Sequence, residues 1–278
     1  MPETRFAEAA QAIQQADALL ITAGAGMGVD SGLPDFRGKD GFWEAYPPYR
    51  HLGLQFHELA NPNWFHRDPA LAWGFYGHRL SLYRSARPHP GFDILKRWAD
   101  TRPRGGFVYT SNVDGQFQKA GFDADSVAEC HGSIHWLQCL ESCGQQPFPS
   151  TPYAVRVEET TMRAVGPFPT CPSCGCLARP NVLMFADWAW DGSQSRAQEI
   201  RLATWLDTVR GGRLVAVECG AGTAIPTVRH MGEALCSETG GMLIRINVRE
   251  PQTPVRLQAM ALACGAREAL ERLEALVG

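Results

Sequence analysis

The stretch Ile21-Thr-Ala-Gly-Ala-Gly-Met-Gly-Val-Asp-Ser-Gly-Leu-Pro-Asp-Phe-Arg-Gly38 decides how this chain folds. The apolar residues 18–22 lead into it and predict a short, buried parallel strand. Gly24, Gly26 and Gly28 follow at alternate positions, and glycines after a strand let the backbone approach a pyrophosphate closely. A plain tight turn is an equal alternative, because the spacing is not G-x-G-x-x-G and no acidic residue ends a second strand about twenty residues later.

The second half of the stretch favours a nucleotide site. Asp35, Phe36 and Arg37 bring an acid, an aromatic ring and a guanidinium onto one short loop beside the expected phosphates. The aromatic, proline-broken residues 41–50 that follow are more typical of a loop or short helix than of a continuing α/β repeat. We interpret them as a lid over the nucleotide.

Size and composition limit the function classes. With 278 residues, of which 45% are hydrophobic and 20% charged, the chain can bury a full core as one large domain with a smaller insert. The formal net charge of -3 gives no overall basic field for nucleic acid. The N-terminus lacks a secretory pattern and there is no apolar run of about eighteen residues, so we expect a cytoplasmic protein without membrane contact.

Repeated strand patterns predict an α/β fold. Residues 105–110, 213–219 and 241–246 are further apolar runs with strand character, and helical patterns lie between them. Strands that alternate with helices imply a doubly wound parallel sheet. An amphipathic helical pattern over residues 255–277 closes the fold.

Polar residues follow the strand predicted over residues 105–110. They are Ser111, Asn112 and Asp114, and open α/β sheets bind ligands at the carboxyl ends of their strands. An asparagine can pair both its donor and its acceptor with a carboxamide, and an aspartate accepts from the amino group. The segment therefore predicts a site for an amide-bearing ligand.

His131 is the candidate general base. A lone histidine before a glycine is more often structural, but an imidazole with a pKa of about 6.5 suits removal of a hydroxyl proton at cytosolic pH. His131 follows a short apolar approach and precedes Gly132, which clears space around the ring. His135 and His230 have no comparable setting, and we assign them structural roles.

Two pairs of cysteines predict a metal site. Cys139 and Cys143 precede Cys171 and Cys174 by about thirty residues, and four thiolates make a closed structural zinc site. Nine cysteines in a cytosolic chain favour metal ligation or free thiols over disulfides. Cys176 is a rival to Cys174 as the fourth ligand.

Tyr76 and Arg79 lie in a helical insert predicted over residues 61–85, whose other aromatic residues mostly suit a core. Residues three apart share a helix face, so this pair can present a phenol and a guanidinium together. A surface arginine beside a core tyrosine is the commoner arrangement for such a pair.

Taken together, these motifs resemble those of the sirtuin family, in the family's order. Residues 24–37 are similar to GAG-x-S-x-x-SGIP-x-FR, residues 110–114 to TQNID, and His131-Gly132 to the HG pair. The four cysteines and residues 179–185, which are similar to RP-x-V-x-x-F, complete the set. The agreement extends from about residue 18 to residue 247.

The resemblance implies a Rossmann-like domain with a zinc module and a helical insert, and NAD and an acyl-lysine protein bound between them. It implies NAD-dependent removal of acyl groups from lysine, with nicotinamide and an O-acyl-ADP-ribose as products. His131 and Asn112 would be catalytic. The residues implied at the cofactor are Gly24, Ala25, Gly26, Asp35, Phe36, Arg37, Ser111, Asn112, Asp114, Gly220, Gly222 and Asn247. Those implied at the substrate are Tyr76, Arg79, Val182, Met184 and Phe185.

Residues 73–79 also resemble the Tyr-x-x-Arg motif of sirtuins that remove malonyl, succinyl and glutaryl groups. An arginine can hold a carboxylate with two parallel hydrogen bonds while a tyrosine donates a third. The resemblance therefore implies a preference for acidic acyl groups.

Several positions depart from the family pattern. Gly28 stands where serine is usual, Ser111 where glutamine is usual, and Ala186-Asp187 where Gly-Glu is usual, while Gly220-Ala-Gly222 replaces GTS. These departures leave open an ADP-ribosyltransferase, an NAD hydrolase, or a catalytically weak module that binds NAD or ADP-ribose.

The domain bounds follow from the same motifs. We expect a Rossmann-like NAD-binding domain from three segments, a lid loop with a helical insert, and a zinc-binding module. In that order, they are residues 1–38, 88–132 and 178–278; residues 39–87; and residues 133–177.

Overall fold

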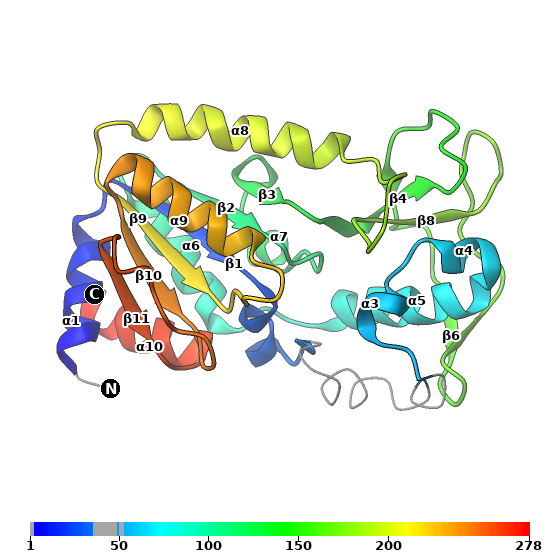
Figure 1. Cartoon of the computed structure of the whole chain (residues 1–278), viewed down its shortest axis with the longest axis horizontal. Helices are drawn as coiled ribbons and strands as arrows, with labels where there is room; N and C mark the ends of the chain where they lie inside the picture. The colour runs from blue at the N-terminus through cyan, green and yellow to red at the C-terminus, as the bar shows by residue number, and fades with distance from the viewer. Residues whose placement is uncertain (1–2, 36–48, 50–52) are drawn as a thin grey trace.

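The structure, a computed structural model, describes residues 3–35, 49 and 53–278 (Figure 1). Its centre is a six-stranded sheet in the order β11-β10-β9-β1-β2-β3, and every neighbouring pair is parallel. This confirms the predicted parallel α/β sheet. The strands are β1 (Ala18–Ala23), β2 (Gly106–Thr110), β3 (Val127–Glu129), β9 (Leu214–Cys219), β10 (Met242–Ile246) and β11 (Ala259–Leu262).

Helices cover both faces of this sheet, which explains why β1 is buried at every position and apolar at all but Thr22. Leu19 and Ile21 pack in one buried cluster with residues of α1 (Glu3–Gln15), α6 (Pro90–Thr101) and α10 (Ala266–Val277). Ala18 and Leu20 face a second cluster with α8 (Ser193–Val209) and α9 (Thr227–Thr239). Figure 1 shows α8 and α9 together on one side of the strands. Short helical turns are η1 (Ala25–Met27), η2 (Val29–Ser31), α7 (Gln116–Lys119) and η4 (Ala124–Ser126).

A smaller part of the molecule has its own sheet and its own core. The strands β5-β4-β8 form an antiparallel sheet, and β6 pairs with β7 as a hairpin. A third buried cluster joins this sheet to three helices. The strands are β4 (Gly132–Cys139), β5 (Phe148–Pro149), β6 (Arg156–Glu158), β7 (Arg163–Val165) and β8 (Ala178–Val182), and the helices are α3 (Phe56–Leu59), α4 (Asn63–Arg67) and α5 (Pro69–Ser85).

Helix α5 is fixed at its start and along one face. The Asp68 carboxylate accepts a hydrogen bond from Leu71 N at 3.1 Å, and Pro69 occupies the first turn, where a missing N–H costs nothing. A Cβ at Gly74 would lie 2.0 Å from Met162 O, so the helix touches the β6–β7 hairpin directly. The helical insert is therefore locked to the segment between the cysteine pairs.

Two strand placements were not expected from the sequence. The segment predicted as one helix over residues 255–277 contains the edge strand β11 before α10, because its first apolar residues pair in parallel with β10. The prediction of a single helix over residues 255–277 was therefore wrong. The sequence analysis assigned strand β8 to the Rossmann-like domain, as part of residues 178–278. In the structure, β8 pairs antiparallel with β4 in the small sheet.

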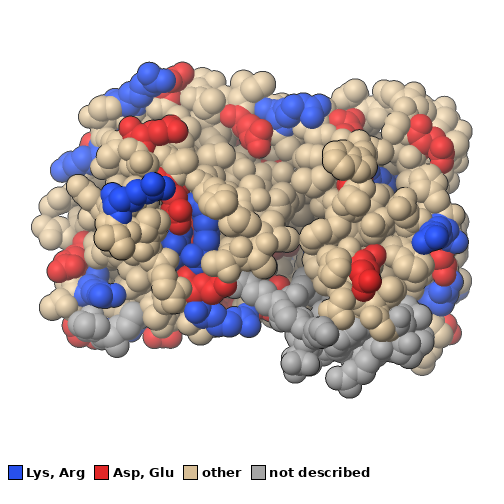
Figure 2. All heavy atoms as spheres, in the orientation of Figure 1, with Lys and Arg blue, Asp and Glu red and all other residues tan. Residues whose placement is uncertain are grey.

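The surface offers no field of a single sign on the face in view. Lys and Arg side chains are interspersed with Asp and Glu over this face (Figure 2), as the small net charge suggests. Among the described residues, no helix is both long and apolar enough to cross a membrane.

Candidate active site

The glycine loops after β1 and β9 touch each other through their backbones. Gly26 N donates to Gly220 O at 3.1 Å, and Gly24 N donates to Cys219 O at 3.0 Å. A Cβ at Gly24 would lie 2.7 Å from Ala221 Cα, and one at Gly220 would lie 2.3 Å from Gly26 C. Gly220 also has a φ of 64°, in the left-handed region that favours glycine. Only glycines allow this approach, which joins the two loops at the carboxyl end of the sheet.

The neighbouring predicted cofactor residues line the same edge of the sheet. Asn247, directly after β10, donates from Nδ2 to Ala221 O at 2.7 Å, which ties it to the loop after β9. Gly222 follows in that loop and is half-buried, as is Ala25 in η1. Asp35 forms an ion pair with Arg249, a residue that sequence reasoning did not select. Phe36 and Arg37, with the expected lid that follows them, lie outside the described residues.

The residues after β2 reach towards the loop after β1. Asn112 Nδ2 donates to Gly24 O at 3.0 Å, and Asn112 N donates to Thr110 Oγ1 at 3.0 Å. Ser111 N donates to Ala23 O at 3.2 Å. The structure therefore brings the predicted carboxamide-binding segment and the predicted phosphate loop together.

Asp114 is a buried carboxyl with a shifted pKa. Its Oδ1 accepts from Gln116 N at 2.9 Å, and its side chain is otherwise shielded from solvent. Burial raises the pKa of Asp114 to about 6, although the hydrogen bond from Gln116 and the charge of Arg79 work against this rise. His135 Nε2 lies 2.9 Å from Asp114 O, consistent with the structural role assigned to His135.

His131 lies between β3 and β4, close to the end of the sheet. Burial lowers the pKa of the His131 imidazole, so the ring is neutral at physiological pH. The next residue must be glycine, because Gly132 has a φ of 73° and a Cβ there would lie 2.1 Å from Asn181 O. His131 O accepts from Leu183 N at 2.9 Å, which fixes the segment after β8 beside it.

The predicted substrate residues lie on that segment and on α5. Val182, opposite Gly132 in the β4–β8 register, and Met184 are buried, whereas Phe185 is partly exposed. Phe185 N donates to Ala60 O at 2.9 Å, and its ring packs edge-on against Phe56 at a centroid distance of 6.1 Å. The segment thus connects His131 to α3.

Arg79 is buried among aromatic rings. It is 6% exposed, and its Nε and Nη2 donate to Tyr83 Oη at 3.1 and 2.7 Å. The guanidinium lies 5.2 to 5.8 Å from the ring centroids of Phe56, Phe75, Tyr76 and Tyr83. Burial raises the pKa of the Tyr76 phenol, which stays a hydrogen-bond donor. Sequence reasoning missed Tyr83, although its i+4 spacing from Arg79 was a usable signal.

The four predicted zinc ligands meet in space. The sulfurs of Cys139, Cys143, Cys171 and Cys174 all lie within 4.8 Å of one another. The pairs Cys139–Cys174 and Cys143–Cys171 are each 3.6 Å apart, close to the separation of about 3.8 Å that tetrahedral Zn–S bonds require. Cys176, the rival ligand, is exposed and outside the cluster. The donor set fits a structural zinc ion.

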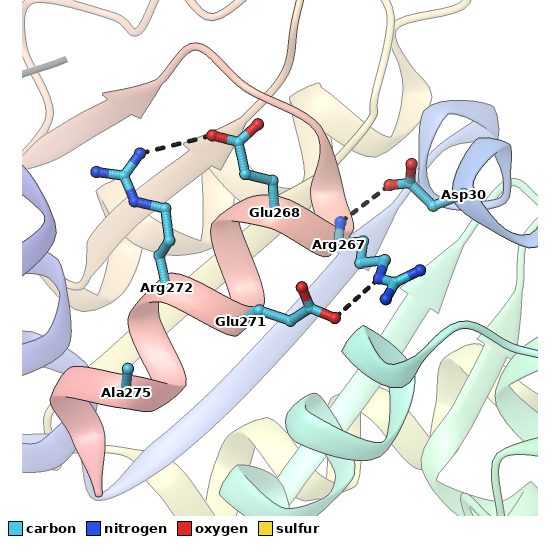
Figure 3. Close-up of a pocket in the computed structure, with 6 residues that line it drawn as sticks. All are labelled: Asp30, Arg267, Glu268, Glu271, Arg272 and Ala275. Atoms are coloured by element: carbon cyan, nitrogen blue, oxygen red, sulfur yellow. Dashed lines mark hydrogen bonds and ion pairs between the residues drawn. The ribbon is translucent and has the colours of Figure 1, made fainter.

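A hollow elsewhere on the surface does not resemble a reaction site. It has a volume of 470 Å³, lies between η2 and α10, and contains none of the predicted site residues (Figure 3). Both of its arginines are engaged in ion pairs, since Arg267 pairs with Glu271 at 2.8 Å and Arg272 with Glu268 at 3.6 Å. Its lining residues are Asp30, Arg267, Glu268, Glu271, Arg272 and Ala275.

Comparisons with known proteins agree with this geometry. The model of the Sir2 family matches residues 24–206. The NAD-dependent protein deacylase of Aquifex aeolicus is 32% identical over 237 residues, 85% of each chain, and the NAD-dependent protein deacylase 2 of Pyrobaculum aerophilum is 34% identical over 255 residues, 91% of this chain and 88% of the relative.

Solved structures of Sir2 homologues also superimpose on this chain. A mutant Sir2 homologue in complex with ADP-ribose superimposes with a TM-score of 0.69 at 27% identity, over 100% of this chain and 96% of the other. A Sir2 homologue in complex with NAD superimposes with a TM-score of 0.69 at 25% identity, over 97% and 93%.

Proposed function

Because this chain belongs to the Sir2 family, we propose that it is an NAD-dependent protein deacylase, which removes acyl groups from lysine side chains of proteins. Relatives with that activity in their names match most of the chain. The observation that carries the proposal is the meeting, at the carboxyl end of the sheet, of the two glycine loops, the Asn112–Asp114 segment and a neutral His131. These are the parts that cleavage of NAD and transfer of an acyl group require.

The residues present fit NAD. The glycine loops after β1 and β9 bring backbone without side chains together at the carboxyl end of the sheet, where open α/β folds bind nucleotides. Asn112 and Asp114 would hold the carboxamide, and Asn247 would approach the adenosine half. Bound NAD supplies the ribose that accepts the acyl group when nicotinamide leaves. The fit and the relatives in complex with ADP-ribose or NAD support NAD as the co-substrate.

The proton chemistry falls to His131. A neutral imidazole can accept a proton from a ribose hydroxyl at Nε2 or Nδ1, whichever is unprotonated, so that the oxygen becomes nucleophilic. Asp114, ionised above its pKa of about 6, would accept from the carboxamide amino group. The Cys139–Cys143–Cys171–Cys174 cluster would hold zinc as a structural ion, because four thiolates leave no open coordination position.

We further propose that acidic acyl groups are the preferred substrates. The Arg79 guanidinium is buried beside the Tyr76 phenol, and its charge acts on Asp114 at the other side of the candidate site. A buried guanidinium binds a carboxylate far more strongly than a methyl group, because the charged hydrogen bonds are poorly screened there. A succinyl, malonyl or glutaryl group would therefore be favoured over acetyl.

Mass spectrometry of acylated peptides tests both the deacylase activity and the preference for acidic acyl groups. Matched peptides that carry acetyl-, succinyl-, malonyl- or glutaryl-lysine are incubated with the protein, with and without NAD. We expect loss of the acyl mass only when NAD is present, with acidic acyl groups lost faster. Acyl loss without NAD, or none under any condition, would overturn the deacylase proposal; equal rates for all four would overturn the acyl preference alone.

A further inference from the structure

Trp188 is the most exposed large aromatic residue that the structure describes, and it lies beside the candidate site. Its side chain is 98% exposed, although tryptophan is highly buried on average. The preceding segment includes Leu183 and Phe185, which are 39% and 38% exposed, with buried Met184 between them. The segment therefore presents apolar side chains to solvent on either side of Met184.

The turn that carries Trp188 is tightly held on both sides. Before it, both carboxylate oxygens of Asp187 accept from the Arg179 guanidinium at 2.8 Å, with both side chains buried. After it, Ala189 O accepts from Gln138 Nε2 at 2.9 Å. The Trp190 indole nitrogen would lie 3.3 Å from a Cβ at Gly132. The exposed indole is therefore presented by a rigid turn that packs directly against the residue after His131.

A rigid, exposed indole loses little conformational entropy when it binds, and tryptophan is enriched among the residues that dominate binding energy. The position selects the partner, because the segment from Leu183 to Trp188 begins directly beside His131, where Leu183 N donates to His131 O at 2.9 Å. A polypeptide that brings an acyl-lysine to His131 therefore comes close to this segment. Apolar neighbours and the neutralised charge of Asp187 favour an apolar side chain on that polypeptide.

We propose that Trp188 is a specificity residue that contacts a large apolar side chain of the substrate polypeptide outside the acyl-lysine. This inference rests on the proposed deacylase function and extends it from the acyl group to the sequence around it. The indole contributes to binding of the polypeptide and not to cleavage of NAD.

The test compares peptide series on wild-type protein, Trp188→Ala and the control Ile200→Ala. Ile200 lies on α8 and is 67% exposed, so Ile200→Ala removes an exposed apolar side chain from a different part of the surface. Each peptide carries one acyl-lysine, and leucine, lysine or serine replaces each of the three residues on either side in turn. A minimal acyl-lysine without flanking residues is the reference. Both kcat/KM and the peptide dissociation constant, from a calorimetric titration, are measured.

We expect wild-type protein and Ile200→Ala to prefer leucine over serine by about tenfold at one or more positions, through KM. Trp188→Ala should lose that preference and keep the KM for NAD and the turnover of the minimal substrate. Unchanged preference in Trp188→Ala, equal loss on the minimal substrate, or a wild-type preference for lysine would overturn the proposal.

Turnover and peptide binding test the role of Trp188 separately from the proposed deacylase function. If wild-type protein turns over no acyl-lysine, the deacylase proposal fails, while the titration still decides the role of Trp188. Weaker binding of leucine peptides to Trp188→Ala supports that role, and equal binding overturns it. A change from dimer to monomer in Trp188→Ala with unchanged peptide preference would assign the indole to a second copy of the chain and overturn it too.

Discussion

Burial shifts the pKa values of two side chains at the end of the sheet in opposite directions, and each shift favours the neutral form. It lowers the pKa of His131 and raises that of Asp114 to about 6. At physiological pH, the histidine is therefore neutral and the aspartate is mostly ionised. Those are the states in which one can accept a proton and the other can accept a hydrogen bond from an amide.

At the scale of the residue, His131→Ala should remove the general base. We expect deacylation to fall at least about a hundredfold, because general-base catalysis contributes on that order, while NAD binding is kept. The measurement is single-turnover acyl loss together with an NAD titration. His230→Ala, which changes an exposed histidine on α9, is the control. Near-normal turnover in His131→Ala would remove this residue from the mechanism.

Asp114→Asn tests the buried carboxyl through stability. The folded-state pKa of Asp114 is raised, so its neutral form contributes stability that is lost as pH rises through about 6. Asparagine keeps an acceptor for Gln116 N and never ionises. We therefore expect the stability of Asp114→Asn relative to wild type to increase by about 1 kcal/mol between pH 5 and pH 7.5 in urea unfolding. A difference that is the same at both pH values would contradict a raised pKa.

Arg79→Met tests the acyl preference. Removing the buried guanidinium should lower the ratio of succinyl to acetyl kcat/KM at least about tenfold, because the carboxylate loses its charged donors. Arg84→Met is the matched control, since Arg84 lies on the same helix but donates to Ser150 O and Tyr153 O. A ratio that Arg79→Met and Arg84→Met leave equally unchanged would exclude the clamp.

Sequence reasoning reached the residues whose chemistry shows in local spacing. Tyr76 and Arg79 are three apart on one helix, and the cysteines come in pairs, so both groups could be selected without coordinates. Tyr83 was assigned to the core with the other aromatic residues of the helix, although its i+4 spacing places it on the same face as Arg79. Asp187, which departs from the family pattern, pairs with Arg179 across a turn that no periodicity describes.

At the scale of the element, the contact between two glycine loops organises the nucleotide end of the sheet. Gly220→Ala should destabilise the protein for two reasons, its φ of 64° and the 2.3 Å approach to Gly26 C. Gly240→Ala is the control, because Gly240 has a φ of 67° but no neighbour within 4 Å of its Cβ position. The control should cost about 1 to 2 kcal/mol, and Gly220→Ala about 1 to 3 kcal/mol more in urea unfolding. Equal costs would mean that the loops separate easily.

Four strands of the large sheet, β1, β2, β9 and β10, were predictable because a strand covered on both faces is largely apolar. The prediction failed over residues 255–277, where leucines at helical spacing obscured the short edge strand β11. Whether a four-residue apolar run extends or coils depends on whether a neighbouring strand has a free edge, and β10 supplies it. The pairing of β8 with β4 likewise depends on a partner about forty residues away.

At the scale of the whole molecule, the zinc cluster should hold the smaller part together. The cysteines close the segment that carries the β6–β7 hairpin, and α5 packs on that hairpin. Cys143→Ser should lose bound zinc and lower the thermal stability of the chain, because metal binding contributes folding free energy. Cys176→Ser should keep both, since Cys176 lies outside the cluster. Metal content by plasma mass spectrometry decides; zinc loss in Cys176→Ser alone would reverse the ligand assignment.

As an NAD-dependent deacylase, this protein should transfer the acyl group of an acyl-lysine to the ADP-ribose part of NAD. The most direct measurement is the mass of the nucleotide product after reaction with NAD and an acyl-lysine peptide. We expect ADP-ribose that carries the acyl group, formed in step with deacylated peptide and free nicotinamide. Free ADP-ribose with an unchanged peptide, or ADP-ribose attached to protein, would contradict it.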